Sequence, residues 1–249
     1  MKSRGQRLGI AGWGKKTTGW GTAIFLTMVV GQPGFADSPG AEGREANLGI
    51  TVRVYDYAHI PHETLIRAQE ETRGIFRKAA VGTEWQHCPA KISPESGDSP
   101  CREVLGPSGV YMRILPASMA ARLDSRREDL GFALGSGTPE AGSDAWVFYH
   151  RVEEVAERSG ASLSVILGHA MAHEIGHLLL GLEPHSPKGI MRGGWHGEDF
   201  ELAAQGQLTF TPEQSEQMRR AVMVRLRQAE LIERHSEAVS QASIAEDRK

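Results

Sequence analysis

Residues 171–191 read MAHEIGHLLLGLEPHSPKGIM, and the HEIGH motif at 173–177 decides how the rest of the chain is interpreted. In an α-helix, residues four apart lie on one face, with about 6 Å of rise between them. His173 and His177 can therefore direct their rings to one metal ion. Glu174 is rotated by about 100° from His173, so it flanks the ion and can act as a general base on a water held there.

The residues around this motif favour a metal site over a purely structural role. HExxH fixes only three positions, and a single buried histidine is more often a hydrogen-bonded core residue than a ligand. Here, however, the two histidines and Glu174 lie within LSVILGHAMAHEIGHLLL, residues 163–180, which is apolar nearly all round and predicts a buried helix. Burying a carboxylate without a compensating charge is very costly, and a bound cation would remove that cost.

The stretch resembles the metzincin clan of zinc peptidases, whose pattern is H-E-x-x-H-x-x-G-x-x-H followed by a Met-turn. The resemblance covers about residues 165–191. In this chain the pattern becomes HExxHxxxGxxxH, because the glycine comes one residue later, at Gly181, and the last histidine two residues later, at His185. Gly189-Ile190-Met191 resembles the Met-turn, which implies that Met191 forms an apolar floor under the metal.

The resemblance implies one zinc ion held by His173, His177 and His185. Gly181 would end the helix by adopting a conformation that other residues avoid, and the next three residues would turn the chain so that His185 reaches the ion. A catalytic zinc site usually takes three protein ligands and keeps a fourth position for water.

Two alternatives for the third ligand stay open. Glu183 occupies the position where the clan's pattern has its last histidine. Glu198 and Asp199 lie about 20 residues past His177, a distance at which glutamate-type zincins place their third ligand.

Other aromatic and histidine side chains near the motif receive structural interpretations. His169 lies four residues before His173, but successive steps of four rotate by about 40°, so His169 is expected to pack beside the site. His196 is interpreted as an exposed loop residue. Trp146, Tyr149 and Trp195 are interpreted as aromatics of the core or of a cleft wall.

The N-terminus predicts export. Residues 1–36 combine five basic residues, the apolar run AIFLTMVV at 23–30 and a small-residue cleavage site, the pattern of a secretory signal. The apolar run is shorter than the roughly 20 residues that span a bilayer, so no stable membrane span is expected in the mature form, although an uncleaved anchor is a minor alternative. The mature protein is expected to be secreted or periplasmic.

Charge and cysteine content limit the classes of function. Without residues 1–36 the chain keeps 23 basic residues, from 28 less the five removed, against 31 acidic ones. This acidic balance argues against nucleic-acid binding, for which a basic face is expected. The two cysteines, Cys88 and Cys101, are predicted to form a disulfide, because an oxidising compartment favours one.

The pattern of the remaining chain predicts an α+β fold. Alternating β-branched residues predict strands, and an apolar stripe after Pro61 predicts a helix. We expect a zincin-like, mixed twisted sheet of about four to five strands, a central active-site helix and a C-terminal helix that Thr211, Pro212 and Gln214 begin. The predicted segments are a linker over 37–47, a metallopeptidase-like domain over 48–233 and a polar tail over 234–249. The expected strands are 49–57, around 85–88, 109–116, 129–137 and 144–150.

Together these patterns predict an exported zinc-dependent endopeptidase that acts on peptide or protein substrates. Glu174 is its general base, and an edge strand around 130–137 could bind substrate as an added strand, as the clan's topology implies. One alternative is a zinc hydrolase of another amide, such as a cell-wall peptide. The other is a non-catalytic, zinc-stabilised binding module. Glu174 argues against the latter, since structural sites are usually closed by four protein ligands.

Overall fold

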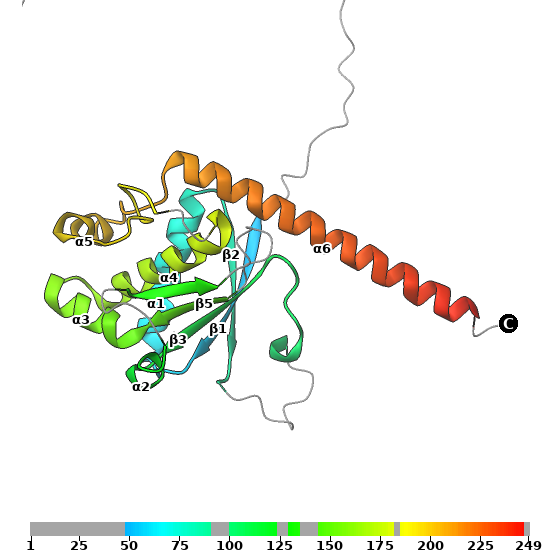
Figure 1. Ribbon diagram of the computed structural model, residues 1–249, viewed down its shortest axis with the longest axis horizontal. Helices are drawn as coiled ribbons and strands as arrows, with labels where there is room; N and C mark the ends of the chain where they lie inside the picture. Colours follow the sequence, from blue (N-terminus) through cyan, green and yellow to red (C-terminus); the bar gives the residue numbers. More distant parts are fainter. Residues whose placement is uncertain (1–47, 91–99, 124–128, 135–143, 182–184, 247–249) are drawn as a thin grey trace, which may run out of the picture. The chain divides into compact units, whose positions relative to one another are not determined.

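The computed structural model describes residues 48–90, 100–123, 129–134, 144–181 and 185–246 (Figure 1). The predicted signal segment, the predicted linker and Glu183 lie outside these ranges.

A five-stranded sheet, in the order β2-β1-β3-β5-β4, forms the centre of the domain. All neighbouring strands pair in parallel except β4, which is antiparallel to β5. The α+β prediction with four to five strands is confirmed. The strands are β1 (Gly49–Asp56), β2 (Gly82–Cys88), β3 (Gly109–Leu115), β4 (Gly131–Leu134) and β5 (Asp144–Phe148).

Helices α1 and α4 lie side by side against one face of this sheet (Figure 1). The alternating residues of β1 and β3 turn their apolar side chains to that face, where they are buried. Thr72 of α1 donates a hydrogen bond to the Gly168 carbonyl of α4, which joins the two helices directly. The helices are α1 (His62–Lys78), α2 (Ala117–Ala120), α3 (Tyr149–Ser159), α4 (Leu163–Leu180), α5 (Gly197–Ala204) and α6 (Pro212–Glu246), with a 3₁₀ turn at Pro100–Arg102.

The boundaries differ from the prediction at two places between β5 and α6. Strand β5 ends at Phe148, and Tyr149 and His150, which were assigned to the strand, begin the helix α3. Val152 and Ala156 give α3 a short buried stripe, and this helical spacing outweighs the strand propensity of the aromatic residues. Helix α5 forms over Gly197–Ala204, where no helix was predicted.

The C-terminal helix also differs in length from the prediction. Helix α6 continues past the predicted domain end at 233 as far as Glu246, and its side chains are exposed over 230–241. No glycine or proline interrupts this part of the chain, and an ion pair between Glu230 and Arg234, four residues apart, supports it locally.

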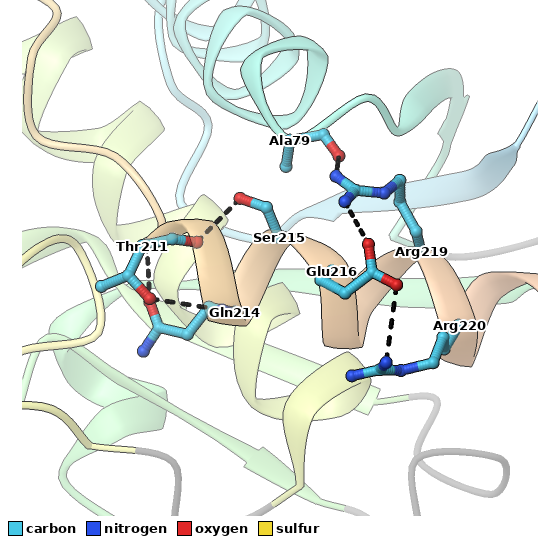
Figure 2. Close-up of polar contacts among 7 residues, drawn as sticks. All are labelled: Ala79, Thr211, Gln214, Ser215, Glu216, Arg219 and Arg220. Carbon is cyan, nitrogen blue, oxygen red and sulfur yellow. Dashed lines mark hydrogen bonds and ion pairs between the residues drawn. The ribbon is translucent and has the colours of Figure 1, made fainter. Parts of the chain in front are cut away.

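The start of α6 agrees with the prediction and ties the helix to the domain (Figure 2). The Thr211 amide donates to Gln214 Oε1 at 3.0 Å, and the Gln214 amide donates to Thr211 Oγ1 at 3.2 Å, so the predicted capping box is confirmed. Five residues after Gln214, Arg219 donates to the Ala79 carbonyl at the end of α1 and pairs with Glu216, as Figure 2 shows.

Helix α6 also satisfies the C-terminal end of α4. The last carbonyls of a helix have no partner within that helix. Gln217 donates to the Leu180 carbonyl at 3.1 Å, and the buried Arg225 donates to the Leu178 carbonyl at 2.6 Å. The cationic guanidinium also suits the negative end of the helix dipole. Two side chains of α6 therefore fix the turn of α4 that carries His177.

Helix α4 is the core helix of the domain. Within the described part of the chain it is the one helix long and apolar enough to cross a membrane, but 83% of this 18-residue segment is buried inside the fold. The disulfide between Cys88 and Cys101 is present, with a Cα–Cα distance of 5.7 Å, and joins the end of β2 to the 3₁₀ turn.

Two glycines in helices should respond to alanine in opposite directions. A Cβ at Gly176 of α4 would lie 2.6 Å from Met191 Sδ and 2.9 Å from a Phe210 ring carbon, whereas a Cβ at Gly74 of α1 would meet nothing within 4 Å. We expect Gly74→Ala to raise the free energy of unfolding by about 0.5–1 kcal/mol through helix propensity. Gly176→Ala should lower it by about 1–3 kcal/mol through overpacking. Urea denaturation measures both, and a stabilising Gly176→Ala would contradict this packing.

Candidate metal centre

Three histidine rings converge at the C-terminal half of α4. His173 and His177 extend from the helix, and His185 reaches back from the chain that follows it. One ligand atom of each lies within 4.8 Å of the others. The distances between ring centroids are 4.8 Å for His173–His177, 4.9 Å for His177–His185 and 5.4 Å for His173–His185. The structure thus brings together the residues predicted as ligands, in an arrangement that could hold a metal ion.

The downstream acids do not join this group. Asp199 is buried and accepts hydrogen bonds from Arg192, at 3.2 Å, and from the His196 amide, at 2.8 Å. It serves the start of α5 instead. Glu198 is exposed in the first turn of that helix.

A hydrogen bond sets the tautomer of His173, and burial favours the neutral form of both His173 and His177. His173 Nδ1 lies 2.7 Å from the Ile190 carbonyl, to which it donates, so Nε2 carries the lone pair. This Nε2 faces His177 Nε2 at 3.1 Å. Burial lowers the pKa of His173 to about 4 and that of His177 to about 3, with the neighbouring histidines adding to the effect. Both imidazoles are therefore neutral near pH 7, the form that binds metals.

Glu174 is buried beside these rings without a hydrogen-bond partner for one of its oxygens. Its side chain is 5% exposed, and Oε2 has no partner among the described residues. Burial, together with the negative charge of Asp129, raises the pKa of Glu174 well above its usual value.

Gly131 of β4 makes room for Glu174. A Cβ at Gly131 would lie 2.8 Å from Glu174 Oε1 and 2.2 Å from the Trp146 carbonyl. This role of Gly131 was not predicted, although a glycine inside a strand is a signal of close approach by another group.

The Gly189-Ile190-Met191 segment forms a turn beneath the helix. Gly189 has a φ of 77°, and a Cβ there would lie 2.8 Å from the Thr209 carbonyl, so only glycine fits without strain. The Ile190 amide donates to the same carbonyl at 3.0 Å. Met191 is fully buried and packs against Gly176, the glycine of HEIGH.

The histidines and Glu174 line an open cavity of about 1270 Å³. Strand β4, helix α3 and the segment over 192–200 border it, and Trp195 and Phe200 are among the residues of that last segment. The sequence prediction placed Trp195 in the core or in a cleft wall, and the structure has it at this cavity. Helix α3, absent from the prediction, supplies part of the border.

No protein-family model matches the chain, and no curated protein matches it. Among solved structures, the chain is similar to archaemetzincin from Methanopyrus kandleri with 14% sequence identity, over 72% of this chain and 98% of that one, at a TM-score of 0.40. A likeness of this size assigns no function to the chain.

A pair of neighbouring glycines tests the position of His185. A Cβ at Gly193 would lie 3.1 Å from Nδ1 and 3.2 Å from Cγ of His185, whereas a Cβ at Gly194 would meet nothing within 4 Å. Gly193→Ala should displace the His185 ring by a few tenths of an ångström and weaken Zn²⁺ binding by about tenfold. Gly194→Ala should leave binding unchanged. Competition titration against a chromophoric chelator measures both affinities, and equal values for the two variants would place His185 elsewhere.

Proposed function

We propose that this chain is an exported, zinc-dependent peptidase in which Glu174 is the general base. The observation that carries the proposal is the buried Glu174 carboxyl group, which lacks a partner for Oε2 among the described residues and lies in a cavity with three imidazoles. A carboxyl group that only stabilised the fold would have hydrogen-bond partners for both of its oxygens. A buried carboxyl group without them, inside a cavity, is instead suited to proton transfer.

The residues present fit a zinc ion. Imidazole nitrogen is a preferred zinc ligand, whereas magnesium and calcium prefer oxygen. His173, His177 and His185 would hold the ion and leave a further position open. The facing Nε2 atoms of His173 and His177, 3.1 Å apart, would both direct lone pairs to it. A bound zinc ion would supply Lewis acidity, which lowers the pKa of a water and polarises a carbonyl group.

Glu174 would perform the proton transfers. It accepts a proton from the attacking water and delivers it to the amine that leaves when the peptide bond breaks. Because Gly131 has no side chain, the β4 backbone can lie close to the carboxyl group. The general base is therefore next to this strand.

The edge strand offers a way to bind an extended peptide. Strands β2 and β4 are the two edges of the sheet in the part of the chain that the structure describes, and β4, which pairs with β5, borders the cavity that Glu174 lines. An extended substrate chain can add to such an edge through backbone hydrogen bonds. Methylating the backbone nitrogens of a peptide substrate should remove this pairing and slow its cleavage.

Export belongs to the same proposal. It rests on the charge and apolar pattern of residues 1–36 and agrees with a disulfide, which oxidising compartments favour. Mass spectrometry of the protein from expressing cells tests it, since the exported form should begin near residue 37.

Glu174→Gln is the direct test of the catalytic role. Glutamine keeps the size of the side chain but cannot accept the proton, so cleavage of a casein substrate should fall by at least about 100-fold while one zinc per chain stays bound. Glu157→Gln, an exposed change on α3, is the matched control and should keep full activity.

Retained activity in Glu174→Gln would remove Glu174 from the mechanism. If the parent protein binds zinc and releases fragments from peptidoglycan but not from casein, the substrate is a cell-wall amide. If it binds zinc and cleaves neither, the catalytic proposal is wrong.

A further inference from the structure

The carbonyl oxygen of Ile190 accepts two hydrogen bonds from side chains of the candidate metal centre. His173 Nδ1 donates to it at 2.7 Å, and Trp195 Nε1 donates at 3.1 Å. A carbonyl oxygen has two lone pairs, so these donors use both of them. The indole therefore holds the group that fixes the orientation of His173.

The indole ring also packs against the histidines. It lies edge-on to His173, with centroids 5.8 Å apart and planes at 82°, and edge-on to His169, at 6.3 Å and 89°. His169 is fully buried, and its Nδ1 bonds to the Val165 carbonyl of the preceding turn at 2.8 Å. Trp195 thus contacts two rings on successive turns of α4 and limits the rotation of the His173 ring.

The chain on both sides of Trp195 is anchored. Before it, Arg192 pairs with the buried Asp199 at 3.2 Å. After it, the His196 amide donates to the same Asp199 oxygen at 2.8 Å. One carboxylate therefore fixes the chain on both sides of the indole.

We propose that Trp195 is a positioning residue for the metal centre, which orients His173 so that Nε2 faces the ion. This inference rests on the proposed function for the identity of the ion, but it concerns binding and not cleavage. Trp195 acts through the Ile190 carbonyl and the His173 ring. Partners of metal-binding histidines that lie outside the ligand shell typically change metal affinity by 10–100-fold when removed.

The test separates the N–H group from the bulk of the ring. Trp195→Phe keeps an aromatic ring but removes the donor, and benzothienylalanine at 195 keeps the shape of tryptophan while sulfur replaces the N–H. Trp85 is the matched control, because its Nε1 donates to Thr83 Oγ1 at 3.1 Å on β2. The same changes there remove a comparable hydrogen bond outside the cavity.

Two readouts decide the outcome. Both changes at position 195 should weaken Zn²⁺ binding by about tenfold or more and shift the visible absorption bands of bound Co²⁺, while both changes at position 85 leave affinity and spectrum as in the parent protein. Benzothienylalanine keeps the test valid if Trp195→Phe does not fold.

Unchanged Zn²⁺ affinity and an unchanged Co²⁺ spectrum in folded protein would overturn the role of Trp195. A parent protein that binds Zn²⁺ but cleaves no peptide would contradict the proposed function and leave the role of Trp195 to be judged on affinity alone. A parent protein that binds neither metal would overturn both.

Discussion

The carboxyl group of Glu174 inside an apolar helix is the constraint on which the rest of the structure depends. Burying an ionisable group costs several kcal/mol unless a charge or a set of hydrogen bonds compensates it. Here the described residues supply no bond to Oε2, the two helical histidines are held neutral, and β4 passes so close that only glycine fits at 131. The described residues thus leave this oxygen without a hydrogen-bond partner, beside three histidines that could hold a metal ion.

The fold divides the site between rigid and connecting elements. Two of the histidines and Glu174 lie on α4. Gln217 and Arg225 of α6 fix the last turn of this helix, and Met191 packs against it at Gly176. His185 and Trp195 come from the chain around the Gly189 turn. The geometry of α4 alone sets the spacing of the two histidines that it carries. The position of His185 depends instead on how the chain after the helix packs. Gly193 leaves room for the His185 ring, and Asp199 fixes the chain at His196.

Local patterns predicted much of this arrangement. The pair His173 and His177, the buried helix, the alternating strands and the Thr211–Gln214 capping box each follow from residues within one or two turns of one another. The features that the sequence analysis missed depend on tertiary contacts. Gly131 and Glu174 are in contact although they are far apart in the sequence. The two hydrogen bonds at the Ile190 carbonyl likewise form only when separate segments come together in the fold. Tyr149 was misassigned because aromatic residues favour strands, whereas the stripe of Val152 and Ala156 determined the helix.

We propose that His173, His177 and His185 together hold one zinc ion and leave one position open. X-ray absorption spectroscopy at the zinc edge, on protein loaded with one equivalent of zinc, tests it most directly, because imidazole rings give a characteristic outer-shell signal. We expect three imidazole nitrogens at about 2.0–2.1 Å and at least one further light ligand, with one imidazole fewer in His185→Ala. A parent spectrum with two imidazoles, or one that His185→Ala leaves unchanged, would contradict it.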